Sequence, residues 1–193
     1  MANDFAAIVA QTLAASIRLH EQAQTSSVAA TVAATELMVA SLRGGGKILV
    51  CGNGGSASDS QHFAAELVGR FERERRALAS IALTTDTSIL TAIGNDYSYD
   101  RVFSRQVEAV GRPGDVLLGI STSGGSRNVL DAFGVAKAGG LSTVALTGRD
   151  GGVVGAAADV HINVPSPSTA RVQEVHRTLM HAMCELIERE LYA

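Results

Sequence analysis

The sequence feature that most constrains the fold is a set of five short apolar runs. Each run is followed by a cluster of Gly, Ser, Thr or Asp and then by a helical stretch. They lie at residues 47–51, 80–83, 116–120, 143–146 and 160–164. Runs that are apolar almost throughout indicate strands buried on both faces, and helical stretches between them indicate parallel pairing. The sequence therefore predicts an α/β fold with a doubly wound, five-stranded parallel sheet flanked by helices.

The segment before the first run has a different pattern. Residues 1–43 are rich in Ala, Leu, Val and Thr, and their apolar residues recur every three to four positions, which predicts two packing helices with a break near 24–26. Residues 44–193 form the predicted α/β core, whose last helix is expected at about 169–190. We expect one domain over residues 1–193, because this length fits a single core and no linker marks a second.

Charge and composition narrow the functional classes. Sixteen Lys and Arg against 19 Asp and Glu give a net charge of −3, so the basic surface expected of a general nucleic-acid binder is missing. Because no apolar run approaches the ~20 residues that span a bilayer and the N-terminus lacks a basic signal start, we expect a cytoplasmic protein without membrane contact. Cys51 and Cys184 are too few for a disulfide framework and are interpreted as reduced core residues.

Two loops at the carboxyl ends of predicted strands carry the chemistry. They read Gly-Asn-Gly-Gly-Ser at 52–56 and Ser-Thr-Ser-Gly-Gly-Ser at 121–126. One such loop alone could be a tight strand-to-helix turn. In both loops, however, small residues let backbone N–H groups converge on a ligand, and hydroxyls and a helix N-terminus add further donors. The two loops together therefore predict a site that binds a sugar phosphate. Neither loop has the Gly-Lys-Ser/Thr of a Walker A motif. The dinucleotide fingerprint is weakened, because residues 52–57 end in Ala.

Titratable residues on two predicted helices add a candidate acid–base or metal site. His62 and Glu66 are at i and i+4, on one helix face and within reach of a common metal or substrate, although such a pair alone is more often a hydrogen bond. Gln173 and His181 differ by about 12 Å along the last helix and about 80° around it, so they cannot easily ligate one ion from one chain. Either that helix starts after Gln173, or neighbouring subunits supply different ligands. By pattern alone, His176 is an equal candidate.

Two further segments have more than one interpretation. Gly94-Asn95-Asp96 is a turn signal that could also offer an amide and a carboxylate to sugar hydroxyls. Residues 71–76 read Phe-Glu-Arg-Glu-Arg-Arg, and this mixture of charges predicts a solvated helix end.

Six motifs taken together resemble one family. They are Cys-Gly-Asn-Gly-Gly-Ser at 51–56, Gln-His-Phe-Ala-Ala-Glu-Leu at 61–67, Gly-Asn-Asp at 94–96, Gly-Asp-Val-Leu-Leu-Gly-Ile-Ser-Thr-Ser-Gly at 114–124, Leu-Thr-Gly at 146–148 and Val-Gln-Glu-Val-His at 172–176. From about residue 44 onward the chain resembles the phosphoheptose isomerases, enzymes of the sugar isomerase (SIS) domain family. Gly125 departs from the family pattern, which has Asn at this place in the phosphate loop.

The resemblance implies an aldose–ketose isomerase that converts D-sedoheptulose 7-phosphate to D-glycero-D-manno-heptose 7-phosphate, the first step towards nucleotide-activated heptose for lipopolysaccharide, S-layer or capsule glycans. It also implies a homotetramer with active sites between subunits and one Zn²⁺, or another divalent ion, per subunit. Glu66 would move a proton between C1 and C2, and His181 would be the acid at oxygen. The implied metal ligands are His62, Glu66, Gln173 and His181. The implied phosphate ligands are Ser121, Thr122, Ser123 and Ser126, and the residues lining the sugar are Asn53, Gly54, Gly55, Glu66, Asn95, Asp96 and Gln173.

Three other functions stay open. The first is a non-catalytic SIS-domain tetramer that binds a protein partner such as a replication initiator. Such relatives share the His-Phe-Ala-Ala stretch but lack a carboxylate at the position of Glu66, so its presence favours the enzyme. The others are a regulator that binds sugar phosphate without turnover, and a nicotinamide oxidoreductase.

Overall fold

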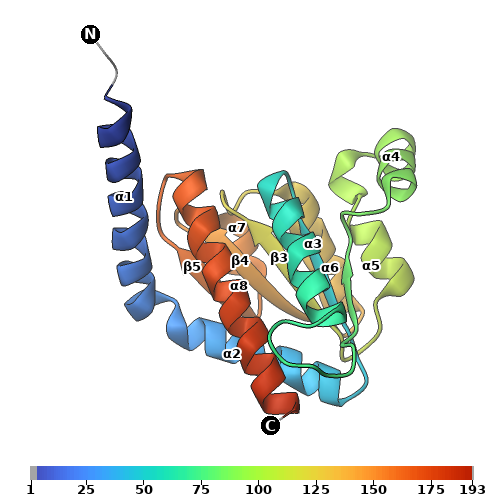
Figure 1. Cartoon of the computed structure of the whole chain (residues 1–193). Helices are drawn as coiled ribbons and strands as arrows, with labels where there is room; N and C mark the ends of the chain where they lie inside the picture. Colours follow the sequence, from blue (N-terminus) through green and yellow to red (C-terminus); the bar gives the residue numbers. More distant parts are fainter. Residues whose placement is uncertain (1–3, 193) are drawn as a thin grey trace.

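The computed structural model describes residues 4–192 and has the architecture that the apolar runs predict (Figure 1). Within this range five strands form one parallel sheet in the order β2-β1-β3-β4-β5. The strands are β1 (Ile48–Gly52), β2 (Ser80–Ala82), β3 (Val116–Ser121), β4 (Ser142–Gly148) and β5 (Val160–Val164). Each predicted strand is confirmed, with ends that differ by two residues at most.

The strand order locates the ligand-binding edge of the sheet. Chain connections run outward from β1 to β2 on one side and from β3 to β4 on the other, so the order reverses between β1 and β3. Ligands in open parallel sheets bind beyond the strand carboxyl ends at such a switch point. Gly52 pairs with Ile120 at the ends of β1 and β3, so both loops predicted to bind a sugar phosphate begin at this point.

Helices cover both faces of the sheet. The first layer consists of α2 (Val28–Arg43), α3 (Gly55–Val68) and α8 (Thr169–Leu191), and the second of α5 (Ser104–Val110), α6 (Arg127–Ala138) and α7 (Gly152–Ala157). Alternate strand residues divide between the layers: Ile48 and Val50 of β1 pack with the first, and Leu49 and Cys51 with the second. Burial on both faces therefore explains why the strands are apolar almost throughout.

α3 and α8 lie side by side and run in the same direction (Figure 1). Asp59 pairs with Arg177, 118 residues later, and His62 contacts His181, 119 residues later. A nearly constant offset between contacting residues means that the two helices are parallel and in register. The two predicted helices that carry candidate site residues are thus neighbours in the first layer.

The N-terminal helices meet at Ser27, next to the predicted break. α1 (Phe5–Ser26) buries Leu19 and Ala23 near its C-terminal end, whereas its N-terminal part stands away from the rest of the chain (Figure 1). Large apolar side chains along α1 are more than half exposed, namely Phe5, Ile8, Val9, Leu13 and Ile17. No single helix among the described residues is long and apolar enough to cross a membrane. Only α1 and α2 taken together, which meet at a bend of 67°, have that length and apolar composition.

Both cysteines have the environment that the composition predicts. Cys51 in β1 and Cys184 in α8 are buried, and neither forms a disulfide within residues 4–192. Burial raises the pKa of the Cys51 thiol to about 12, so this thiol stays protonated at neutral pH.

Gly94, Asn95 and Asp96 form the last turn of α4 (Thr87–Asp96) and are not a turn between elements. The carboxylate of Asp86 caps the start of this helix, because it accepts a hydrogen bond from the Ile89 N–H. The short 3₁₀ helix η1 (Tyr99–Arg101) follows α4 and leads towards α5.

The charged run at 71–76 is exposed at Glu72, Arg73, Glu74 and Arg76, as predicted, but it is not a helix end, and the prediction is wrong for Arg75. α3 already ends at Val68, and the chain then runs without helix to β2. The Arg75 side chain is fully buried and pairs with the buried carboxylate of Glu188 on α8. A partner more than 100 positions away along the chain thus reverses what the local charge pattern predicts.

Candidate active site

Three side chains from α3 and α8 form the centre of the site. Nε2 of His62 lies 3.4 Å from a carboxylate oxygen of Glu66 and 2.7 Å from Nε2 of His181. The ligand atoms of all three side chains lie within 4.8 Å of one another, and all three residues are partly buried. The structure therefore brings together both predicted catalytic residues and three of the four predicted metal ligands.

The surroundings of His181 disfavour its protonated form. Burial lowers the pKa of this imidazole, and the neighbouring His62 and Arg177 lower it as well. The charge of Glu66 acts in the opposite direction, but the net pKa stays below its ordinary value. The ring of His181 also packs against the ring of Phe71, with the centroids 5.5 Å apart. A neutral imidazole keeps one nitrogen lone pair free, which suits both a metal ligand and a group that exchanges a proton with oxygen.

The donor set of the cluster fits a divalent transition metal. Two imidazole nitrogens and one carboxylate oxygen are ligands that zinc accepts. Nε2 of His62 and Nε2 of His181, 2.7 Å apart, and the Glu66 carboxylate would be the groups that hold such an ion between α3 and α8.

Gln173 lies away from this cluster on the same chain. Because α8 begins at Thr169, the alternative that the helix starts after Gln173 is wrong. Its amide packs against the start of α3, where a Cβ added to Gly55 would come within 2.2 Å of Nε2 of Gln173. Gln173 and His181 line one hollow of about 670 Å³, but about 12 Å of helix separates them.

The first loop needs glycine for two different reasons. Gly54 precedes α3 with φ +56° and ψ −120°, a conformation that side chains disfavour. Gly52 lies in close contact with its surroundings, because an added Cβ would be 2.8 Å from Cβ of Ser56 and 3.0 Å from the Ile120 carbonyl oxygen. These constraints hold the loop close to the carboxyl end of β3.

Asn53 of the first loop is tied to the second loop by a residue that the sequence did not single out. Its side-chain amide exchanges two hydrogen bonds of 2.9 Å with the buried amide of Asn128 on α6. The Tyr99 hydroxyl donates a third, of 3.3 Å, to the Asn53 side-chain oxygen. No motif marks Asn128, since its importance depends on the β1–β3 pairing that brings the two loops together.

The second loop gathers hydroxyls at the start of α6. The hydroxyls of Ser121 and Ser126 lie 2.8 Å apart, and the Ser123 hydroxyl accepts a hydrogen bond from the Gly125 N–H. Thr122 lies between them in the same loop. A Cβ added to Gly125 would contact only the Ser123 hydroxyl, at 3.8 Å, so the loop has room for the Asn of the family pattern.

Asn95 and Asp96 lie apart from the other predicted site residues. Both are exposed at the end of α4, where the Asn95 amide donates to the Asp96 carboxylate over 2.8 Å. α4 lies at the opposite side of α3 from α8 in Figure 1. A single chain therefore does not bring these two residues to the His62–Glu66–His181 cluster.

Comparisons with known proteins agree with this fold. The SIS domain family profile matches residues 11–148. A phosphoheptose isomerase of Neisseria gonorrhoeae (strain NCCP11945) is 58% identical over 186 residues, which cover 95% of this chain and 94% of that protein. The solved structure of a phosphoheptose isomerase from Neisseria gonorrhoeae matches with a TM-score of 0.90 at 55% identity, covering 94% of this chain and 97% of that one. One from Francisella tularensis matches with a TM-score of 0.91 at 38% identity, covering 94% and 96%. The chain belongs to the SIS domain family and, within it, to the phosphoheptose isomerases, which are aldose–ketose isomerases.

Proposed function

We propose that this chain converts D-sedoheptulose 7-phosphate to D-glycero-D-manno-heptose 7-phosphate by proton transfer through an enediol. The observation that carries the proposal is the cluster of His62, Glu66 and His181, two of whose members lie on the helix that follows the first of two hydroxyl- and glycine-rich loops. The identity to phosphoheptose isomerases over nearly the whole chain supports the choice of substrate.

Two side chains supply the proton chemistry. Isomerisation removes a weakly acidic proton from the carbon next to a carbonyl, so it needs a positioned base and an acid that serves oxygen. Glu66 takes the proton from one carbon and returns it to the neighbouring carbon. His181 gives a proton to the carbonyl oxygen and takes one from the adjacent hydroxyl. His62, which contacts both side chains, holds them on one side of the substrate.

We assign a divalent ion, Zn²⁺ or a similar metal, to His62, Glu66, His181 and Gln173. When bound, this ion supplies electrophilic stabilisation of the negative charge that develops on the substrate oxygen. A carboxylate bound to a metal is a weaker base, so the two imidazoles would hold the ion and leave the Glu66 carboxylate to take the proton. Gln173 lies too far from His181 along α8 to act in the same chain and would act from a neighbouring subunit.

The two loops bind the ends of the substrate. Phosphate is held by hydroxyls and backbone N–H groups at the start of α6, without Lys or Arg. The phosphate ligands are Ser121, Thr122, Ser123 and Ser126. The sugar is lined by Asn53, Gly54, Gly55, Glu66, Asn95, Asp96 and Gln173.

The assembly that completes this site is a homotetramer with active sites between subunits. Two observations support it. The first is the row of exposed apolar side chains along α1. The second is that Asn95 and Asp96 lie on α4, on the other side of α3 from α8 (Figure 1), while Gln173 lies eight residues before His181 on α8. A patch of this kind on a helix that stands away from the body is typical of a surface that another subunit covers. The enzyme would act in the cytoplasm, in the first step towards nucleotide-activated heptose for lipopolysaccharide or related glycans.

The test is turnover of sedoheptulose 7-phosphate, followed by NMR of the aldose product with added Zn²⁺ and after chelation. We expect product in the wild type and a loss of several orders of magnitude in Glu66→Gln and His181→Gln, with the oligomer unchanged by sedimentation. Glu185→Gln, a partly exposed carboxylate on α8 that pairs with Arg189, is the matched control and keeps wild-type turnover.

The result also separates the alternatives. Absence of turnover in an assembled, metal-supplied protein would favour the SIS-domain tetramer that binds a protein partner. Tight binding of sugar phosphate without turnover, unchanged in Glu66→Gln, would favour a regulator.

A further inference from the structure

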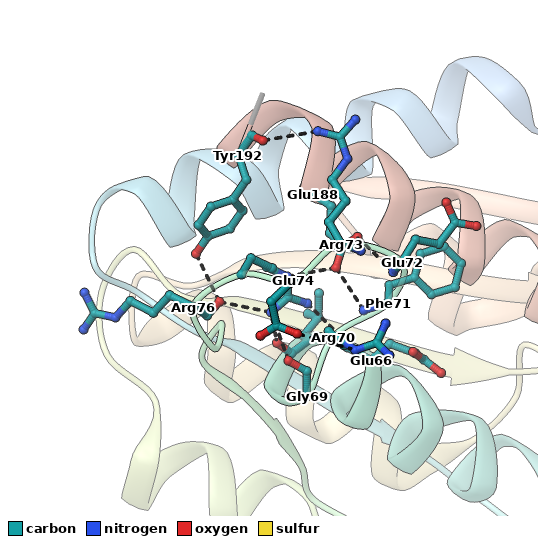
Figure 2. A network of polar contacts seen from close by, with 12 residues as sticks. Glu66, Gly69, Arg70, Phe71, Glu72, Arg73, Glu74, Arg76, Glu188 and Tyr192 are labelled. Carbon is teal, nitrogen blue, oxygen red and sulfur yellow. Dashed lines mark hydrogen bonds and ion pairs between the residues drawn. The ribbon is translucent and has the colours of Figure 1, made fainter.

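Glu188, near the end of α8, is a buried carboxylate that the proton chemistry does not use. Figure 2 shows it surrounded by the segment that follows α3. One oxygen accepts hydrogen bonds from the Phe71 N–H and from Nε of Arg75, both of 2.9 Å. The other oxygen accepts from the N–H groups of Glu72 and Arg73, both of 3.0 Å. Four donors therefore converge on this one side chain.

Arg75 joins this network to the end of α3. Its guanidinium donates to the backbone carbonyls of Glu66 and Leu67, both over 2.8 Å, while its side chain is fully buried. The last carbonyls of a helix have no partner within the helix, and a positive charge there also matches the helix dipole. Arg75 therefore fixes the final turn of α3, the turn from which Glu66 projects.

The network contacts the catalytic cluster at two points. Through Arg75 it holds the backbone of Glu66. Through the Phe71 N–H it holds the residue whose ring lies against the imidazole of His181. Since Glu188 and His181 both belong to α8, and Glu66 belongs to α3, the network sets the position of one helix relative to the other where they carry the reacting groups.

We propose that Arg75 and Glu188 are positioning residues of the isomerase site, which hold Glu66 and His181 at their working separation. This inference rests on the proposed function of those two residues. A displacement of 1 Å in an active site can lower turnover about 100-fold, so a network that fixes two helix backbones acts on kcat without touching substrate.

Each buried charge in the network also has a partner of opposite charge. Burial alone would raise the pKa of the Glu188 carboxyl, but the hydrogen bonds from Phe71, Arg73, Glu72 and Arg75 hold it below its ordinary value. Glu188 is therefore ionised beside a permanently charged guanidinium at neutral pH. Replacing one member by a neutral side chain leaves the other charge buried without its partner, which displaces the segment.

The test compares Glu188→Gln and Arg75→Lys with a matched control. Asp115, at the start of β3, is also a buried carboxylate that accepts two backbone N–H groups and a cation: the N–H of Lys47, the N–H of Arg112 and Nζ of Lys47. Its partners precede β1 and β3, and none of them belongs to α3, to α8 or to the segment between α3 and β2. Asp115→Asn therefore removes a comparable network without moving the cluster.

We expect kcat for sedoheptulose 7-phosphate, at saturating Zn²⁺ and per folded protein, to fall tenfold to 100-fold in Glu188→Gln and Arg75→Lys, with KM changed less than about threefold. Asp115→Asn is expected to lose stability but to keep kcat within about twofold. If the network only stabilises the fold, the folded fraction of all three variants has the same kcat.

A second measurement does not depend on turnover. The chain has 5 histidines, so ring signals of ¹³C-labelled histidine can be assigned with His181→Gln. We expect the His181 signal to move in Glu188→Gln, because the Phe71 ring shifts, and to stay in Asp115→Asn. If the wild-type protein shows no turnover, the proposed function is refuted. The His181 signal still reports whether Glu188 fixes the position of the Phe71 ring.

Wild-type kcat together with an unmoved His181 signal in folded Glu188→Gln or Arg75→Lys would overturn the inference. If both variants fail to fold, Phe71→Leu tests the same contact, because it keeps the backbone N–H that Glu188 binds. We expect this variant to fold and to lower kcat, and an unchanged kcat would reject the positioning role.

Discussion

His176 on α8 makes the stability of this protein depend on pH well above the range in which carboxylates titrate. Its side chain is fully buried, and Nε2 lies 2.9 Å from the Thr147 carbonyl oxygen, to which the neutral ring donates. Burial lowers the pKa of this imidazole from its ordinary value of 6.5 to about 4, although the hydrogen bond to Thr147 and the charge of Asp59 act in the opposite direction.

The sign and size of the effect follow from these two values. Between pH 6.5 and pH 4 the unfolded chain takes up a proton on His176 that the folded chain does not, so stability falls as pH falls. At about 1.4 kcal/mol per pH unit, the contribution reaches about 2 kcal/mol by pH 5 and about 3 kcal/mol below pH 4. His161 and His181, whose pKa values burial also lowers, add smaller effects of the same sign.

The assay is urea unfolding at pH 7, 6 and 5 for the wild type and His176→Gln, at one fixed protein concentration because the apparent stability of any protein that assembles depends on its concentration. Gln keeps an N–H donor near the position of Nε2 but does not titrate. We expect the wild type to lose about 2 kcal/mol more than the variant between pH 7 and pH 5. Glu188 does not contribute in this window, because its stabilisation is lost only as pH falls below its ordinary pKa, 4.5. Equal losses in the two proteins would refute the reasoning.

Two further predictions concern the loops. Gly55→Ala should fold, because the added Cβ meets only the flexible end of the Gln173 side chain, at 2.2 Å. We expect it to displace that amide and to lower kcat about tenfold, measured by steady-state kinetics beside a stability control. Asn128→Ala should free the Asn53 amide from its partner and raise KM several-fold with a smaller change in kcat, and unchanged kinetics would show that the bridge does not hold the substrate loop.

The parts of the fold that could be predicted from sequence are those that depend on local pattern. β1 and β3 are buried at every position and, apart from Ser121 at the end of β3, have no polar side chain. Such a run can be recognised without knowledge of its neighbours. The i, i+4 spacing likewise places His62 and Glu66 on one face of α3, and the structure brings the two side chains into contact.

The parts that local pattern could not predict depend on partners distant in the chain. Arg75 lies in a run of mixed charge, and nothing nearby distinguishes it from a solvated arginine. Its burial follows from Glu188, 113 positions later, which offers a carboxylate in an otherwise apolar layer. The role of Asn128 could not be predicted for the same reason, because its partner Asn53 lies 75 positions earlier, in the loop after β1.

The parallel pairing of α3 and α8 links these separate observations. Gly55 meets Gln173 at one end, His62 meets His181 in the middle, and Phe71 meets Glu188 beyond the other end, at offsets of 117 to 119 residues. Because each contact fixes the same relative position of the two helices, a slide of α8 along α3 would break all of them at once. The separation of Glu66 and His181 is therefore set from both ends of the pair, and a substitution at either end can change turnover without touching substrate.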